Sequence, residues 1–383
     1  MKKFLALILA LVMSLSLVAC GGSKEEAKPA EQPAEQPAEE QGADFSVAMI
    51  TDYGDITDQS FNQTTYEACK AYCEANGVDF NYYKPAGDST AERVAMVEAA
   101  VDDGYTVVVM PGYAFGETIT QVADEYSDIT FIALDVGEGD LGDYTLPSNV
   151  YCAVYQEELC GYMAGYAAVK LGYTHLGFLG GMAVPAVVRY GYVFVQGADA
   201  AATETGADVT MEYVYGNQFW GDADITAYMD NWYQTLGVEV VFACGGGIYA
   251  SAAEAAAKVG GKVIGVDVDQ AGIIDGGYGD GMTVTSAMKG LAPTVEHMLT
   301  EVAAGNFANY GGKIETLGLV SGDDPAANYV QIPMESTQWS DSFSQDDYKA
   351  LVKDLFDGKI TVSNDISAMP STAITVNEYG NIK

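Results

Sequence analysis

The sequence predicts an α/β fold with two domains, each built on a parallel sheet covered by helices. Short apolar runs alternate with helical patterns along most of the chain, which is typical of parallel strands joined by helices. The run at 106–110 is almost entirely apolar, as expected of a strand with both faces covered. About 340 residues follow residue 43, more than one hydrophobic core usually serves.

The amino terminus predicts an export signal rather than part of this fold. Lys2 and Lys3 precede a mostly apolar stretch, residues 4–18. As a helix this stretch would span about 22 Å, less than the roughly 30 Å hydrocarbon core of a bilayer. Residues 1–19 are therefore interpreted as a signal peptide. Small residues before Cys20 resemble a bacterial lipobox, so we expect a lipid on Cys20 that holds the protein on a membrane. An ordinary cleavage site with an incidental cysteine is the alternative.

Residues 20–43 predict a lipidated cysteine followed by a disordered tether. Pro-Ala-Glu repeats begin at Pro29, Pro33 and Pro37, and the segment has no bulky apolar residues. It cannot bury a core, and its prolines and like charges should keep it extended.

The charge balance and the metal-binding residue types exclude several partners. The chain has 17 Lys and Arg against 54 Asp and Glu, a formal net charge of −37. Nucleic acid is bound through Lys and Arg, so we expect no nucleic-acid partner. With two histidines, His175 and His297, and no Cys-x-x-Cys, we expect neither a metal nor a cofactor. Besides Cys20 there are five cysteines, and an odd number does not suggest a full disulfide framework.

Strand and helix signals alternate in two successive series. The predicted strands are 45–50, 78–83, 106–110, 130–134 and 148–155 in the first series, and 175–179, 209–214, 238–242, 262–266, 282–289 and 313–320 in the second. A helix near 346–357 and a short strand at 360–362 should finish the chain. Loops at 52–63, 111–116 and 135–143 leave the carboxyl ends of strands, where open α/β folds bind ligands.

A glycine-rich turn at 244–247 precedes a predicted helix. It has no P-loop lysine, and no dinucleotide-binding loop occurs in the chain. We interpret these glycines as letting the backbone approach a neutral ligand closely, with Tyr249 facing that ligand.

The loop at 51–63 carries the clearest ligand chemistry. It holds three carboxylates, Asp52, Asp55 and Asp58, together with Phe61 and Asn62, and it has no Lys, Arg or His. Such a loop suits a ligand with hydroxyl or amino donors and a flat apolar face. It suits a phosphate poorly, because no cation is there to pair with it.

The same loop resembles the first-loop signature of the basic membrane protein family, substrate-binding lipoproteins that serve ATP-driven importers as purine-nucleoside receptors. That signature is roughly Asp-x-Gly-x-x-x-Asp-x-Ser-Phe-Asn, and it is matched at 52–62. Met-Pro-Gly-Tyr-Ala-Phe at 110–115, Phe-Ile-Ala-Leu-Asp at 131–135 and Gly-Val-Asp-Val-Asp-Gln at 265–270 are also similar to family motifs. The resemblance is close over about residues 45–320 and loose beyond them.

This resemblance implies a two-lobed fold of the type I periplasmic-binding-protein kind, with the ligand in a cleft between the lobes. We expect residues 44–153 and 283–318 in the first lobe, and 154–282 and 319–383 in the second. The implied protein is not an enzyme. It is lipid-anchored on the extracytoplasmic face of the cell membrane, closes over a purine nucleoside and delivers it to ABC permease and ATPase subunits. Apart from the resemblance, a monomer is the default expectation.

The matched motifs also imply roles for side chains on the base side of the ligand. Phe61 would stack on the base, and Asn62 and Asp135 would read its polar groups. Asp52 would contact further polar groups of the ligand. From the residues alone, Asp135 could equally be a helix cap or a solvated loop residue.

Three later residues are implied on the sugar side and at the mouth of the cleft. Asp267 would accept hydrogen bonds from vicinal ribose hydroxyls, and Lys289 would donate to the sugar. Trp220 begins a Trp-x-Asp that is common in the family, and it could stack on a base or only pack between domains.

Two alternatives to a nucleoside receptor stay open at this point. The same fold could bind another small ligand, such as a sugar or a signal molecule, because fold does not fix ligand. A secreted nucleoside hydrolase using the clustered aspartates of the first loop is the other alternative, although no histidine lies near them.

Overall fold

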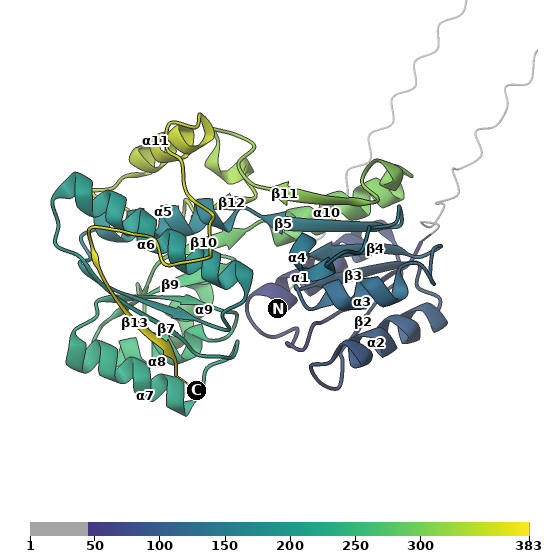
Figure 1. Cartoon of the computed structure of the whole chain (residues 1–383), viewed down its shortest axis with the longest axis horizontal. Helices are drawn as coiled ribbons and strands as arrows, with labels where there is room; N and C mark the ends of the chain where they lie inside the picture. The colour runs from purple at the N-terminus through teal and green to yellow at the C-terminus, as the bar shows by residue number, and fades with distance from the viewer. Residues whose placement is uncertain (1–44, 383) are drawn as a thin grey trace, which may run out of the picture. The chain divides into compact units, whose positions relative to one another are not determined.

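The computed structural model describes residues 45–382 (Figure 1). The predicted signal peptide, the lipid site at Cys20 and the tether lie outside the described residues. The described part consists of two sheets with helices packed on them, as the alternating sequence pattern predicted. No helix within residues 45–382 is long and apolar enough to cross a membrane.

The first sheet has six parallel strands in the order β11-β5-β4-β3-β1-β2. Its strands are β1 (Val47–Ile50), β2 (Phe80–Tyr83), β3 (Val107–Pro111), β4 (Thr130–Leu134), β5 (Val150–Tyr155) and β11 (Lys313–Leu317). The associated helices are α1 (Phe61–Asn76), α2 (Thr90–Asp102), α3 (Phe115–Val122), α4 (Glu138–Leu141) and α10 (Leu291–Ala303). Strands β1 and β3 are buried along their whole length, which explains their nearly unbroken apolar sequence. We call this part the first lobe.

The second sheet has seven strands in the order β12-β10-β9-β8-β6-β7-β13, and only β12 runs antiparallel to its neighbour. Its strands are β6 (His175–Gly180), β7 (Thr210–Tyr215), β8 (Val240–Cys244), β9 (Lys262–Asp267), β10 (Thr283–Lys289), β12 (Val330–Gln331) and β13 (Thr375–Asn381). The associated helices are α5 (Glu157–Lys170), α6 (Pro185–Thr205), α7 (Ala223–Asn231), α8 (Tyr249–Ala257), α9 (Ala271–Tyr278) and α11 (Gln345–Phe356). We call this part the second lobe.

Helices α5 and α6 pack unusually close in the second lobe, and glycines on both helices make this packing fit. A Cβ atom on Gly165 would lie 2.2 Å from the carbonyl oxygen of Phe194, and one on Gly197 would lie 2.0 Å from that of Tyr162. Only glycine fits at these two positions, because any side chain there would overlap the backbone of the facing helix.

The expected lobe boundary differs from the sheet order at residues 283–289. These residues were expected in the first lobe, but β10 pairs with β9 in the second sheet. The first lobe regains the chain afterwards, since α10 packs on α1 and β11 pairs with β5. An isolated apolar run indicates a strand but not its sheet, because the partner strand is chosen by tertiary contacts.

The last 30 residues also differ from expectation. The predicted strand at 360–362 does not form, and the strand that closes the chain is β13, next to β7. Between α11 and β13 the chain crosses the outside of α6, seen in yellow in Figure 1. There the Gln196 side chain exchanges two hydrogen bonds with the backbone of Ser363, and Asp199 accepts from the amides of Ala373 and Ile374.

Candidate functional site

A cavity of about 1080 Å³ lies among the loops that follow the carboxyl ends of strands in both sheets. Cavities that bind small molecules usually measure about 300–1,000 Å³. All seven predicted ligand residues line it: Asp52, Phe61, Asn62, Asp135, Trp220, Asp267 and Lys289. The sequence thus predicted which loops meet, and the structure brings them to one place.

Asp52 and Asp58 fix the conformation of the first loop. One oxygen of Asp52 accepts from the amides of Tyr53 and Gly54, each at 2.6 Å. Asp58 accepts three backbone amides and the side-chain amide of Asn62. Burial raises the pKa of Asp52, and the hydrogen bonds from Gly54 and Tyr53 offset this only in part. Asn62, which was expected to read a base, is therefore also part of the scaffold of this loop.

Lys289 lies at the centre of the cavity, at the carboxyl end of β10. Its ammonium contacts Asp135 at 2.5 Å, Glu157 at 3.4 Å and Asp267 at 3.9 Å. It also lies 5.4 Å from the centroids of the Phe61 and Tyr190 rings. Burial lowers the pKa of Lys289, but Asp135, Glu157 and Asp267 outweigh it and raise that pKa above its usual value. Lys289 therefore stays charged and links the two lobes, because Asp135 follows β4 of the first lobe.

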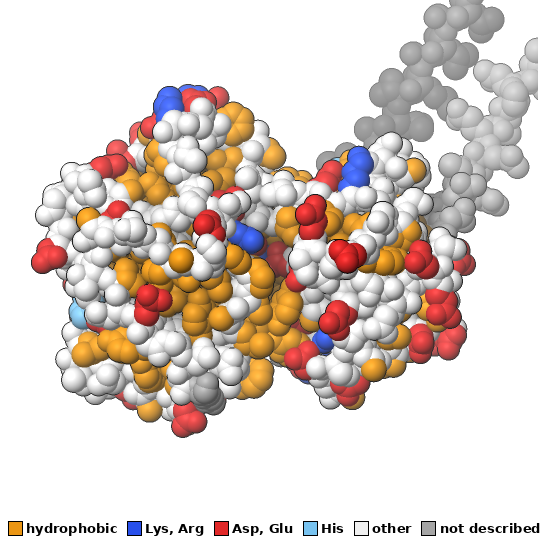
Figure 2. All heavy atoms as spheres, in the orientation of Figure 1, with side chains coloured by type: hydrophobic (Ala, Val, Ile, Leu, Met, Phe, Trp, Pro, Cys, Tyr) orange, Lys and Arg blue, Asp and Glu red, His pale blue; other side chains and the backbone are white. Residues whose placement is uncertain are grey.

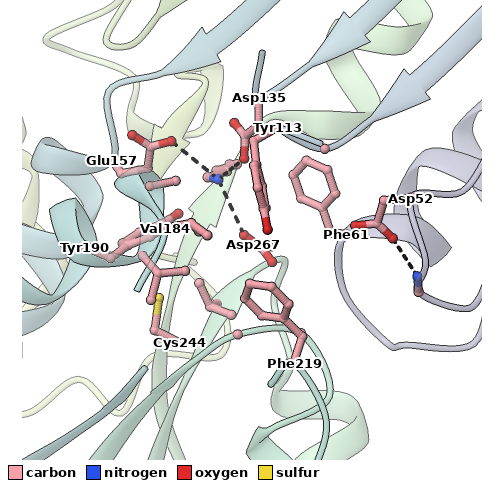
Figure 3. A pocket seen from close by; sticks show the side chains of 18 of the residues that line it. Asp52, Phe61, Tyr113, Asp135, Glu157, Val184, Tyr190, Phe219, Cys244 and Asp267 are labelled. Atoms are coloured by element: carbon pink, nitrogen blue, oxygen red, sulfur yellow. Dashed lines mark hydrogen bonds and ion pairs between the residues drawn. The ribbon is translucent and has the colours of Figure 1, made fainter. Parts of the chain in front are cut away.

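Asp135 and Asp267 have the same unusual backbone conformation. Both occupy the left-handed region, with φ values of 58° and 67°, and each lies at the carboxyl end of a strand. A residue other than glycine in this region carries strain, typically about 1–3 kcal/mol, that concentrates at functional sites. The conformation turns both carboxylates toward the same cavity (Figure 3).

The two carboxylates differ in how they are paired. Oδ2 of Asp267 accepts from the Ser60 hydroxyl at 2.6 Å, a contact between the lobes. Oδ2 of Asp135 accepts from Lys289, whereas its Oδ1 is buried with no hydrogen-bond partner among the described residues. Burial raises the pKa of Asp267, against the lowering effects of Lys289 and Ser60. A buried acceptor without a partner is costly, so Asp135 is poised to accept a donor from a ligand.

Aromatic rings reach the cavity from both lobes. Figure 3 shows Phe61 entering from the first lobe and Phe219 from the second. Phe219 also lies 6.3 Å from the ring centroid of Tyr53. Trp220, the aromatic residue that the sequence singled out here, is 55% exposed at the rim. Asp222, which completes the Trp-x-Asp motif, caps α7 through the amides of Asp224 and Ile225.

The glycine-rich turn at 244–247 packs against protein as well as lining the cavity. A Cβ atom on Gly245 would lie 2.8 Å from Gly181, and one on Gly181 would lie 2.4 Å from the Phe219 ring. These glycines leave room for the Phe219 ring, a packing role that was not predicted from the sequence. Tyr249, expected to face a ligand, does line the cavity.

Several residues that line the cavity were not predicted from the sequence: Tyr53, Tyr113, Glu157, Arg189, Tyr190 and Phe219. Phe219 directly precedes Trp220, the aromatic residue that the sequence predicted at the site, and the sequence does not tell which of the two side chains points into the cavity. Glu157 and Arg189 lie in predicted helices where charged residues are usually solvated. Their pairing across α5 and α6 at 2.6 Å has no signature in the sequence.

No group of three or more His, Cys, Asp and Glu side chains within residues 45–382 is arranged to hold a metal ion. The five cysteines of this part of the chain are all free and buried, and Cys244 also lines the cavity.

Comparison with known families gives a match to the Bmp family, described as ABC transporter substrate-binding protein PnrA-like, over residues 45–351. The chain belongs to this family. The resemblance stated from the sequence is confirmed. The match ends at residue 351, before the segment that crosses α6 and before β13. The protein is therefore a substrate-binding protein of ABC transporter type, and its family and fold are those of binding proteins rather than enzymes.

This Bmp family member is also similar to several named proteins. A CD4+ T-cell-stimulating antigen of Listeria monocytogenes is 29% identical, covering 82% of this chain and 87% of the relative. An ABC transporter nucleoside-binding protein, BmpA, of Lactococcus lactis is 25% identical, covering 83% and 89%. An uncharacterised lipoprotein of Pyrococcus horikoshii is 27% identical, covering 59% and 53%.

Among solved structures, an ABC transporter solute-binding protein of Aeropyrum pernix superimposes with a TM-score of 0.63 at 21% identity, covering 83% of this chain and 87% of that one. This likeness shows the fold, which is of the type I periplasmic-binding-protein kind, as the sequence predicted.

Proposed function

We propose that this Bmp family protein is the receptor of an ABC importer for purine nucleosides. The observation that carries the proposal is the arrangement of two ring faces and two carboxylates around one cavity. Phe61 and Phe219 offer apolar faces to a flat base. Asp135 offers a buried oxygen that lacks a partner, and Asp267 offers a carboxylate for hydroxyl donors beside Lys289. The printed name of the Lactococcus lactis relative supports the same ligand class.

Thermal unfolding of the mature chain, residues 20–383, with nucleosides, free bases and pentoses tests this proposal. A ligand at 100 times its dissociation constant adds about 2.7 kcal/mol to the stability of the protein that binds it. For a chain of this size we expect a rise of several degrees with inosine, guanosine or adenosine, and none with a base or ribose alone. A rise with a sugar but with no nucleoside would refute the ligand assignment.

We also propose that the receptor performs no chemistry on its ligand and delivers it unchanged to the permease. Incubation with inosine should therefore release no free hypoxanthine. Detection of hypoxanthine at a rate that increases with protein concentration, and that Asp52→Asn abolishes, would contradict this part of the proposal.

Anchoring by a lipid on Cys20 is the third part of the proposal. The small residues before Cys20 support it, and so does the name of the Pyrococcus horikoshii relative, a lipoprotein. Cells grown with labelled palmitate should label the wild-type protein, which then stays with the extracytoplasmic face of the membrane. Equal labelling of Cys20→Ala would overturn the assignment of the anchor.

A further inference from the structure

Glu157 is a buried carboxylate that the ligand roles above do not use. It begins α5, directly after the strand β5 that leaves the first lobe, and its side chain is 1% exposed. One oxygen lies 2.6 Å from a guanidinium nitrogen of Arg189, and the other lies 3.4 Å from the ammonium of Lys289. Glu157 thus connects Arg189 at the side of the cavity to Lys289 at its centre.

Arg189 has a position that would otherwise suit an anion. It lies near the start of α6, lines the cavity and keeps a quarter of its side chain exposed, 24%. Arg is the residue best shaped to bind a phosphate or a carboxylate from a ligand. In this structure its guanidinium is turned to Glu157 instead.

The other cations that line the cavity are also paired. Lys84 contacts Asp55 at 2.6 Å, and Lys289 contacts Asp135. Three cations in all line the cavity, against nine carboxylates. Among the residues that the structure describes, no cation at the cavity lacks a carboxylate partner. Acidic side chains also outnumber basic ones on the face of the molecule that Figure 2 shows.

The central group of charges has a formal sum that depends on Glu157. Arg189 and Lys289 supply two positive charges, and Asp135, Asp267 and Glu157 supply three negative ones. An anionic ligand entering this cavity would leave water and gain no free cation, which is unfavourable at short range in a partly buried site. Without the Glu157 charge the group would be neutral, and Arg189 would be available to a ligand.

We propose that Glu157 is a specificity-determining residue that makes the cleft select ligands without a negative charge, by neutralising Arg189 and sharing Lys289. Applied to the proposed ligand class, on which this inference rests, the receptor accepts a nucleoside and rejects its 5′-monophosphate. Glu157 does this through the two cations, without touching the ligand itself.

Calorimetric titration of the mature chain with a nucleoside and its 5′-monophosphate tests the proposal. At pH 7.5 the phosphate carries about two negative charges. We expect wild type to prefer the nucleoside by at least about 100-fold, and Glu157→Gln to reduce that ratio about tenfold, the equivalent of about 1.4 kcal/mol. Gln keeps the size and an acceptor oxygen, so loss of charge is the main change.

Glu158→Gln is the matched control. It removes the same formal charge from the next residue of α5, which also lines the cavity but forms no ion pair within 4.0 Å among the described residues. Its ratio should stay within about twofold of wild type, because the expected tenfold change comes from freeing Arg189. An equal reduction in Glu158→Gln and Glu157→Gln, or an unchanged ratio in Glu157→Gln, would overturn the proposal.

Two further measurements keep the test decisive. If Glu157→Gln does not fold, Arg189→Gln is titrated in its place. This variant makes the cleft more negative and should raise the preference for the nucleoside over its monophosphate, so a lowered ratio would refute the proposal. If wild type binds no nucleoside, the proposed ligand fails, and thermal unfolding in inorganic phosphate replaces titration. Phosphate should then stabilise Glu157→Gln more than wild type and Glu158→Gln, and equal shifts in all three would overturn the inference.

Discussion

Two buried carboxylates of the second lobe, Glu212 and Asp267, differ in how completely they are paired. At the far edge of the sheet, Glu212 accepts from His175, Asn377 and Tyr379, at 2.9, 3.2 and 2.6 Å. In the cleft, Asp267 has one close donor, Ser60, and Lys289 3.9 Å away, and the neighbouring Asp135 keeps one oxygen without a partner.

The pKa values record this difference. Burial acts to raise the pKa of Glu212, but Tyr379, His175 and Asn377 outweigh it and lower that pKa below its usual value. For Asp267 burial dominates, and its pKa is raised despite Lys289 and Ser60. A fully paired buried carboxylate stabilises the fold, whereas an incompletely paired one keeps its capacity for a ligand. The hydrogen bonds of Glu212 also tie β7 to β13, and β13 lies outside the part of the chain that the family match covers.

Asp267→Asn should have the largest effect on ligand binding and little effect on folding. The Asn side chain has one acceptor oxygen where Asp has two, and it has no charge to balance Lys289. We therefore expect nucleoside affinity to fall by about 3 kcal/mol, or roughly 100-fold. Because the raised pKa means that the charged form is disfavoured in the fold, the midpoint of thermal unfolding should hardly fall. Calorimetric titration measures the affinity and thermal unfolding measures the stability. Retained affinity would contradict the assignment of Asp267 to ligand binding.

Glu212→Gln should do the reverse. Loss of charge-assisted bonds from His175 and Tyr379 should lower the free energy of unfolding by about 2 kcal/mol at neutral pH, with nucleoside affinity unchanged. Because the pKa of Glu212 is lowered in the fold, its contribution is present above the usual value of 4.5 and disappears as the pH falls through the lowered value. Denaturant unfolding at neutral and acidic pH checks this, and weaker nucleoside binding in this variant would show that the two carboxylates are coupled.

Phe61→Leu should have a smaller effect, again confined to the cleft. Leucine keeps most of the apolar area but not the ring face, and an aromatic pair contributes about 0.5–1.5 kcal/mol beyond area. We therefore expect about a fivefold loss of nucleoside affinity, with ribose compounds that lack a base unaffected. The same replacement at Phe356, an exposed aromatic of α11, serves as the control and should leave affinity unchanged.

Acidification should weaken nucleoside binding modestly. Asp52 and Asp267 have raised pKa values, so they take up protons at a higher pH than ordinary carboxylates and then lose acceptor capacity. One such proton changes affinity by at most about tenfold per pH unit, and we expect roughly a threefold loss between pH 7.5 and 5.5. Asp267→Asn should flatten this dependence, and an unchanged slope in that variant would assign the effect to another group.

The sequence alone determined the layered α/β fold, the strands of both sheets except β12 and β13, and the loops that form the site. It could do so because apolar periodicity and strand-end loops are local properties. Asp52, Phe61, Asp135, Asp267 and Lys289 each follow or border a predicted strand, so their convergence could be expected from the parallel topology.

Only the tertiary structure decided which sheet receives β10, which way Phe219 and Trp220 point, and which cation each carboxylate holds. Glu157 and Arg189 are 32 positions apart on two helices, and nothing in the spacing predicts that they meet. The same is true of Glu212 and Tyr379, 167 positions apart. Ion pairs and strand partners between distant segments depend on how the packed elements are placed in space, and a local sequence pattern does not carry that information.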